Sequence, residues 1–220
     1  MVRARSHARP RIDYQKPATP GLDIEAHSVC YRVTRSIAFV RSTAYQESED
    51  DPVATATACF MLGANRTNML TDRPMDFRAS PTLEAPEDPA SPFAKSPFAR
   101  CLGIRVGDDG ALVMPFSPKI IGNPILPAIH GGMTGAFLET TAIVGVAREL
   151  GVSSPKPIGL TVNYLRSGRA LDSHAKVSIV KQGRRVVAFE AQAWQDDPAK
   201  PIASAFGHFM LRQTPEVDEE

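Results

Sequence analysis

A single apolar helix that opens on a glycine turn is the feature that most constrains this chain. Residues 131–150 follow His130 and are almost entirely apolar up to Gly151, and a glycine in that place favours the end of a helix. A helix that is apolar on every side packs within a protein core and is wrapped by other elements. We therefore predict a core helix over residues 130–150.

Glu139 is the exception on this helix. An ionised carboxylate is costly to bury alone, so it needs a partner, a raised pKa or a chemical role. The nearest positions toward the helix start are Gly132, Gly135 and Ala136, which predicts a groove beside the acid. Free N–H groups at the start of the helix can stabilise developing negative charge. Two structural explanations stay open: close approach of another backbone to the glycines, and pairing of the acid with an arginine.

The segment from His130 to Glu139 has the pattern H-G-G followed by an acid nine residues after the histidine. It resembles the hotdog-fold acyl-CoA thioesterases of the phenylacetate and 4-hydroxybenzoyl-CoA type. The resemblance implies an α+β fold in which a curved antiparallel sheet wraps around the helix. It further implies that Glu139 is the catalytic carboxylate and that the N–H groups of Gly131 and Gly132 polarise the thioester carbonyl.

The resemblance also assigns two residues before the helix. An asparagine upstream of the histidine often places water or the carbonyl in this family, and Asn123 is the candidate, although it lies one residue farther from His130 than is usual. His130 itself is expected to orient the loop and not to act as the base. No metal or cofactor is expected.

Strand patterns extend the resemblance over residues 96–212. Alternating or apolar segments predict strands at 160–166, 175–180, 187–193 and 202–211. Residues 181–185 predict a hairpin turn with Gly183 at its tip. Upstream, residues 102–116 predict a lead-in strand and a hairpin that turns at Asp108-Asp109-Gly110.

The N-terminal part of the chain repeats the strand half of this pattern at an offset of 149–150 residues. The corresponding pairs include Tyr14 and Tyr164, Asp23 and Asp172, Ala26 and Ala175, Arg35 and Arg185, and Phe39 and Phe189. The helix has no counterpart. We therefore predict a partial hotdog module over 11–62 without a central helix, and a complete hotdog domain over 98–212. Each module leaves an unpaired strand edge, so the two sheets are expected to join edge to edge. Without a helix, the apolar residues of the first module are expected to need cover: Val29, Tyr31, Val33, Ile37, Phe39 and Phe60. Two explanations compete: the natural chain starts upstream of Met1, or the first module is a degenerate pairing partner.

Composition and charge bound the remaining possibilities. Six prolines in residues 63–97 predict a linker, with a short helical turn near 73–77. A net charge of +1 argues against a nucleic-acid binder, and no apolar run is long enough to span a membrane. Three cysteines without metal-binding spacing fit unpaired thiols in a reducing cytoplasm. These cysteines are Cys30, Cys59 and Cys101. Four histidines are expected on the surface or on a strand face, without a metal site: His7, His27, His174 and His208.

Helix geometry predicts an assembly. Gly131 and Glu139 are eight residues apart, which is about 12 Å along one helix, and they point in different directions around its axis. One thioester carbon cannot reach both, so the site needs two helices side by side. We expect a homodimer or a higher homo-oligomer, with the helices paired across it.

The function predicted from the resemblance is hydrolysis of an acyl-CoA thioester. Basic side chains are then expected to bind the CoA phosphates, and the candidates are Arg166, Lys181, Arg184 and Arg185. Two alternatives remain open. One is a non-catalytic acyl-CoA-binding or assembly protein, which the missing first helix favours. The other is a hotdog acyl-thioester dehydratase, because residues 124–127 resemble the approach loop of that family.

Overall fold

The computed structural model describes residues 9–62, 93, 96–123, 128–153 and 155–211. Its elements in chain order are β1 (Arg11–Tyr14), β2 (Glu25–Val33), β3 (Ile37–Tyr45), β4 (Ala54–Met61), α1 (Pro97–Cys101), β5 (Arg105–Val106), β6 (Leu112–Met114), the 3-10 turn η1 (Pro118–Ile120), β7 (Ile121–Asn123), β8 (Ala128–Ile129), α2 (Gly131–Leu150), β9 (Lys156–Tyr164), β10 (Ser173–Gln182), β11 (Val186–Trp194) and β12 (Ala203–Met210). One long helix therefore accompanies many strands, which is the predicted α+β class.

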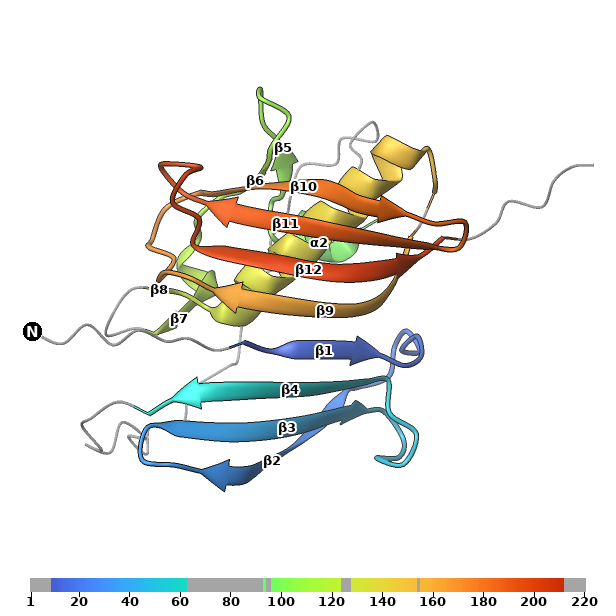
Figure 1. Cartoon of the computed structure of the whole chain (residues 1–220), viewed down its shortest axis with the longest axis vertical. Helices are drawn as coiled ribbons and strands as arrows, with labels where there is room; N and C mark the ends of the chain where they lie inside the picture. Colours follow the sequence, from blue (N-terminus) through green and yellow to red (C-terminus); the bar gives the residue numbers. More distant parts are fainter. Residues whose placement is uncertain (1–8, 63–92, 94–95, 124–127, 154, 212–220) are drawn as a thin grey trace, which may run out of the picture.

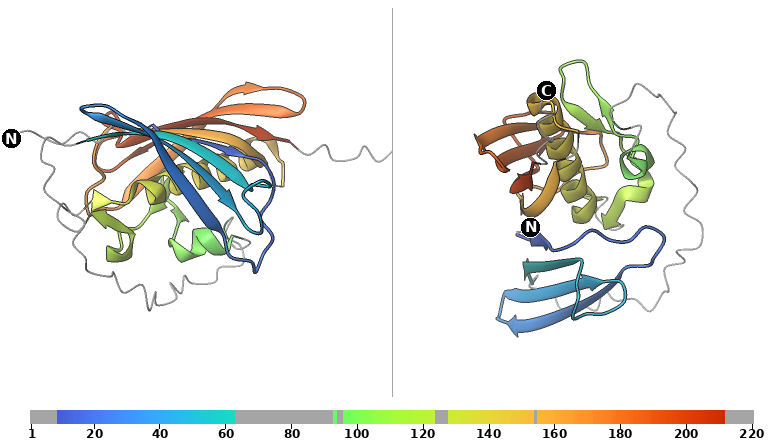
Figure 2. Two further views of the ribbon diagram at one scale, coloured as in Figure 1. Left: turned by 90° about the horizontal axis from the view of Figure 1, so that it is seen from below. Right: turned by 90° about the vertical axis from the view of Figure 1, so that its right-hand side faces the viewer.

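Ten strands form a single antiparallel sheet in the order β2-β3-β4-β1-β9-β12-β11-β10-β6-β5 (Figure 1). The helix α2 lies across one face of this sheet and packs against β9, β10, β11 and β12. The sheet curves around the helix (Figure 2). The predicted hotdog arrangement, in which a curved antiparallel sheet wraps a central helix, is confirmed.

The ends of α2 follow from its sequence. His130 is the N-cap, and its side chain accepts a hydrogen bond from the N–H of Gly132. Gly151 ends the helix in the left-handed conformation with φ of 66°, where a residue without Cβ is favoured. The predicted helix is therefore confirmed at both ends.

Only one side of α2 is fully covered by the described residues. Phe137, Leu138, Ala142 and Val146 face the sheet and are completely buried. A second stripe at helical spacing is only half-buried, and it consists of Met133, Ala136, Thr140, Ile143, Ala147 and Leu150. The prediction of a helix enclosed on every side is therefore wrong for the described residues, because the sheet covers one side and leaves an apolar stripe on the other.

The strand order has an internal two-fold symmetry. Strands β1-β4-β3-β2 and β9-β12-β11-β10 run outward in the same order from a central β1–β9 pair, in which Arg11 lies opposite Thr161. The prediction that the two sheets join edge to edge is confirmed, and the joining strands are the two that end in Tyr14 and Tyr164.

The sheet register corrects two of the expected correspondences. Strands β2 and β10 end at Val33 and Gln182, and β3 and β11 begin at Ile37 and Val186, so both pairs differ by 149 residues. Arg35 and Phe39 therefore correspond to Arg184 and Ala188, and not to Arg185 and Phe189. The sequence comparison missed this because the hairpin and its two strands keep one offset while β1 and β9 keep another.

Strands β2, β3 and β4 have no helix across them within the described residues (Figure 2). Among the residues expected to need cover, Val29, Tyr31, Val33 and Phe60 are 48–58% exposed. Ile37 and Phe39 are half-buried. An apolar surface of this kind is uncommon in a soluble monomer, and it is therefore a candidate contact surface.

The C-terminal strands agree with the predicted ones to within a few residues, and β9 begins four residues earlier than expected. Gly110 turns the lead-in hairpin with φ of 78°, as expected for the Asp108-Asp109-Gly110 turn. The short helix α1 was not predicted. Most of the predicted linker, and the helical turn near 73–77, lie outside the described residues. Within the described part of the chain, no helix is long and apolar enough to cross a membrane.

Candidate active site

Glu139 lies beside the half-buried stripe of α2 and contacts the first module. The hydroxyl of Tyr14, at the end of β1, donates a hydrogen bond to Oε2 of Glu139 over 2.9 Å. Burial raises the pKa of the Glu139 carboxyl, and the hydrogen bond from Tyr14 partly opposes this because it stabilises the ionised form. The acid that had no evident partner in the sequence therefore has one, and it comes from a residue 125 positions away.

Tyr14 is held in its neutral form by burial and by the same contact with Glu139. Burial is the largest cause that raises the pKa of this phenol, and the negative charge of Glu139 adds to it. The hydroxyl therefore remains protonated and remains a donor at any pH at which the protein would work. The sequence aligned Tyr14 with Tyr164 in the repeat but gave no sign that its hydroxyl reaches α2.

The raised pKa of Glu139 predicts a pH-dependent stability. Between the ordinary value of 4.5 and the higher folded value, the folded protein binds more protons than the unfolded chain. Its stability should therefore fall as the pH rises through this window and stay lower above it. We expect the free energy of unfolding of the wild type, relative to Glu139→Gln, to decrease over this range.

Urea unfolding at fixed protein concentration measures this difference. Glu149→Gln changes an exposed acid on the same helix and keeps Glu139, so it is the matched control and should show the same decrease relative to Glu139→Gln as the wild type does. A wild-type stability that stays constant or increases relative to Glu139→Gln would contradict the raised pKa.

The start of α2 carries the predicted oxyanion donors, and one of them is occupied. The N–H of Gly132 donates to Nδ1 of His130 over 3.0 Å, so the proton of the neutral imidazole is on Nε2. No acceptor for the N–H of Gly131 is present among the described residues. A carbonyl oxygen could bind Gly131 directly, but it would have to compete with His130 for Gly132.

Tyr164 closes the side of the helix where a groove was expected. Its hydroxyl donates to the carbonyl oxygen of Gly131 over 2.6 Å. A Cβ added at Gly131 or Gly135 would lie 3.2 Å or 3.5 Å from Tyr164 atoms, so the ring occupies the space beside both glycines. The groove prediction is wrong at Gly135, because an aromatic side chain from β9 fills that space. Gly132 remains exposed.

His130 is fixed by the short strands before the helix. Its backbone N–H donates to the carbonyl of Ile120 over 2.8 Å, and a Cβ at Gly122 would lie 2.7 Å from its Cα. Strand β7 therefore packs directly on this residue. Asn123 ends β7, and its side chain lies outside the described residues.

The four candidate phosphate-binding residues lie at two ends of the sheet. Arg166 follows Tyr164, which pairs with Ala203, and its Nη1 donates to the carbonyl of Pro201 over 2.6 Å. The exposed Lys181, Arg184 and Arg185 surround the β10–β11 turn, where Val186 pairs with Met210 at the opposite end of β12. They therefore cannot bind one phosphate group together with Arg166.

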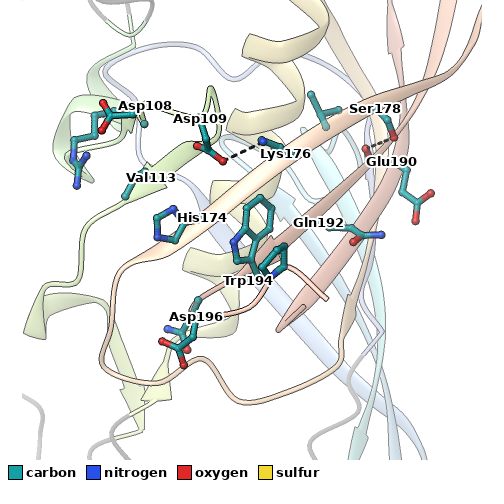
Figure 3. A pocket seen from close by; sticks show the side chains of 15 residues that line it. Asp108, Asp109, Val113, His174, Lys176, Ser178, Glu190, Gln192, Trp194 and Asp196 are labelled. Carbon is teal, nitrogen blue, oxygen red and sulfur yellow. Dashed lines mark hydrogen bonds and ion pairs between the residues drawn. The ribbon is translucent and has the colours of Figure 1, made fainter. Parts of the chain in front are cut away.

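A surface cavity of about 740 Å³ lies away from these residues, beside β6, β10 and β11. The labelled side chains around it include His174 and Trp194, whose rings stack at 6.1 Å, and Lys176, which pairs with Asp109 (Figure 3). Neither Glu139 nor Gly131 lines it. The cavity is therefore not the candidate active site, because Glu139, whose pKa is raised, and the start of α2 lie elsewhere.

Residues 123–210 match the sequence profile of a family described as Acyl-CoA thioesterase N-terminal domain. No curated protein sequence matches the chain significantly. Among solved structures, the acyl-CoA thioesterase II TesB2 of Mycobacterium marinum is 12% identical, with a TM-score of 0.65 over 97% of this chain and 84% of that one. The TesB protein of Mycobacterium avium subs paratuberculosis is 12% identical, with a TM-score of 0.62 over 96% and 80%. A protein from Bacillus halodurans, solved with CoA, is 25% identical over 53% of this chain and 79% of that one, with a TM-score of 0.46.

Proposed function

We propose that the chain is a hotdog-fold acyl-CoA thioesterase, as the family profile matched by residues 123–210 supports. We further propose that it hydrolyses an acyl-CoA to a free acid and CoA with Glu139 as the reacting acid. The observation that carries this proposal is the position of Glu139. It is the one carboxyl on α2 that is largely removed from water, and burial raises its pKa toward the range useful for proton transfer.

In the proposed reaction, Glu139 takes a proton from water while the water oxygen attacks the thioester carbon. The carbonyl oxygen becomes negative and is stabilised by N–H groups at a helix start, those of Gly131 and Gly132. The tetrahedral intermediate then expels the CoA thiolate, which receives the proton held by Glu139. Alternatively, Glu139 attacks the carbon itself, expels the thiolate and forms an anhydride that water hydrolyses.

The internal symmetry supports a site made from two helices. Helix α2 begins beside Tyr164, so the two-fold relation that carries Tyr164 onto Tyr14 would begin a second helix beside Tyr14. Glu139 already lies beside Tyr14. The acid of α2 would therefore face the glycine turn of the second helix, and the turn of α2 would face the second acid. The described residues of 9–62 contain no helix, and a second copy of this chain can supply one.

The CoA phosphates are proposed to bind near a basic side chain at the mouth of the site. Arg166 is only two residues beyond Tyr164, which contacts Gly131. The hairpin residues Lys181, Arg184 and Arg185 are a strand length away from that point. Arg166 is thus the better placed candidate for a substrate whose carbonyl lies at the α2 turn. Asn123 stays a candidate for placing water at the same turn.

A non-catalytic acyl-CoA binder is the second candidate function, and the occupied N–H of Gly132 is the observation that favours it. A panel of acyl-CoAs with short, long and aromatic acyl groups separates the two functions. The purified protein is incubated with each, and released CoA thiol is measured alongside binding. We expect thiol release that depends on protein concentration. Binding without thiol release across the panel would favour the second candidate.

Gly132→Val should lower the rate of hydrolysis and leave the fold intact. An added Cβ would lie 3.0 Å from Nδ1 of His130, so the branched side chain would displace the imidazole and crowd the helix start. The exposed position can absorb the change without disturbing the core. We expect the rate constant to fall by about tenfold or more.

His130→Ala is the comparison that locates the cause. It removes the imidazole and its contact with Gly132 but adds nothing at the turn. We expect it to retain more activity than Gly132→Val, as measured by thiol release. A folded Gly132→Val protein with the wild-type rate would remove the turn from the mechanism.

A further inference from the structure

We propose that Tyr14, supplied by the first module, is a positioning residue that holds Glu139 in one ionised, oriented state during thioester hydrolysis. This inference rests on the proposed function of Glu139. It gives the helix-free first module a direct part in the active site, because β1 belongs to that module and its terminal side chain reaches the acid.

The geometry supports an orienting contact. A glutamate side chain has three rotatable bonds, and the 2.9 Å hydrogen bond from Tyr14 restrains one carboxylate oxygen while leaving the other to face water or substrate. The phenol comes from a strand locked on both sides, since β1 pairs with β4 and with β9. Tyr14 therefore presents its hydroxyl from a rigid support.

Among the described residues, no other charged side chain lies beside the Glu139 carboxyl to act on its ionisation. Tyr14 faces it from β1, while the Tyr164 hydroxyl on β9 is committed to Gly131. Apart from the uncharged Ser173, the buried side chains that β10, β11 and β12 place in the core are apolar: Ala175, Val187, Phe189, Ala191, Ala193, Ala203, Ala205 and Phe209. The other ionisable residues of α2 lie at its two ends, His130 at the start and Arg148 and Glu149 in the last turn. The hydrogen bond is thus the one described contact that favours the ionised acid.

The symmetry offers a matched residue with a different contact. Tyr164 occupies the corresponding place in the second module, yet its hydroxyl donates to a backbone carbonyl and not to the acid. Removing either hydroxyl costs one hydrogen bond from a half-buried tyrosine to α2. Only the loss at Tyr14 should change the proton affinity of Glu139.

The experiment compares Tyr14→Phe, Tyr164→Phe and Tyr45→Phe through the pH dependence of kcat/KM. Without the Tyr14 hydroxyl, the pKa of Glu139 rises further, so the acidic limb should move to higher pH. We expect kcat/KM of Tyr14→Phe to fall by about tenfold on that limb and to recover partly at higher pH. Tyr164→Phe should keep the wild-type limb. Tyr45→Phe, whose hydroxyl meets Glu25 on the surface, should match the wild type throughout.

A second measurement does not depend on activity. The Glu139 carboxyl is titrated by its ¹³C chemical shift in the wild type and in the Tyr14→Phe protein, with Glu139→Gln used to assign the signal. A higher pKa of the Glu139 carboxyl in Tyr14→Phe supports the proposed contact, whether or not the protein hydrolyses a thioester. Absence of thioester hydrolysis by the wild type would refute the proposed function and not this contact. An unchanged Glu139 pKa, or an activity loss equal at every pH, would overturn the positioning role.

Discussion

Replacing Glu139 with glutamine is expected to lower thioester hydrolysis by about 100-fold or more, a loss of about 2.7 kcal/mol of transition-state stabilisation. Glutamine keeps the shape of the side chain and can still accept the hydrogen bond from Tyr14. It cannot take a proton from water or attack the thioester carbon. The rate should therefore fall mainly through kcat, with little change in binding.

The matched control is Glu149→Gln, which removes an exposed acid from the last turn of the same helix. It should keep the wild-type rate. Thiol release at saturating acyl-CoA measures both variants, and their unfolding curves establish that both are folded. Undiminished turnover by folded Glu139→Gln would exclude this acid from the chemistry.

An equally large effect is expected from loss of assembly. The half-buried apolar stripe of α2 and the exposed apolar side chains of β2 and β4 both need cover, and burial of each favours association. We expect assemblies of at least two chains at micromolar concentration, with no hydrolysis by a separated chain. Ile143→Glu, in the α2 stripe and away from the sheet-facing side, should dissociate the assembly and abolish turnover.

Sedimentation combined with activity across a dilution series checks this expectation. The specific activity should fall as the assembly dissociates. Lys176→Glu, a charge change on β10 outside the stripe, is the control that should neither dissociate nor inactivate the protein. A stable 23.8 kDa monomer that retains full activity would contradict both the assembly and the two-helix site.

Local sequence patterns were sufficient to predict the helix and most of the sheet. The run of apolar residues between His130 and Gly151 defines α2 because its length, its glycine turn and its terminal glycine all agree. The repeat predicted that two strand sets would join at their edges. Both predictions depend on neighbours in sequence or on a period, which a single chain displays directly.

The contacts of the candidate site could not be predicted in the same way. Tyr14 reaches Glu139 only because β1 pairs with β9 in one register, and that register is set by packing across the whole sheet. The engagement of Gly132 by His130 depends on one imidazole orientation. Arg166 and the hairpin cations were all candidates for binding the CoA phosphates, but a full strand length separates them.

The measurement that most directly tests a site shared between two helices is complementation between two variants that are each impaired in a different part of the site. Glu139→Gln chains retain the turn, and Gly132→Val chains retain the acid, so a mixed assembly contains one site with both parts intact. Co-refolding equal amounts should restore roughly a quarter of the wild-type rate of thiol release, as expected for random two-fold pairing. A mixture no more active than the two variants separately, although co-purification of two differently tagged chains shows that mixed assemblies form, would contradict a site built from the acid of one helix and the turn of another.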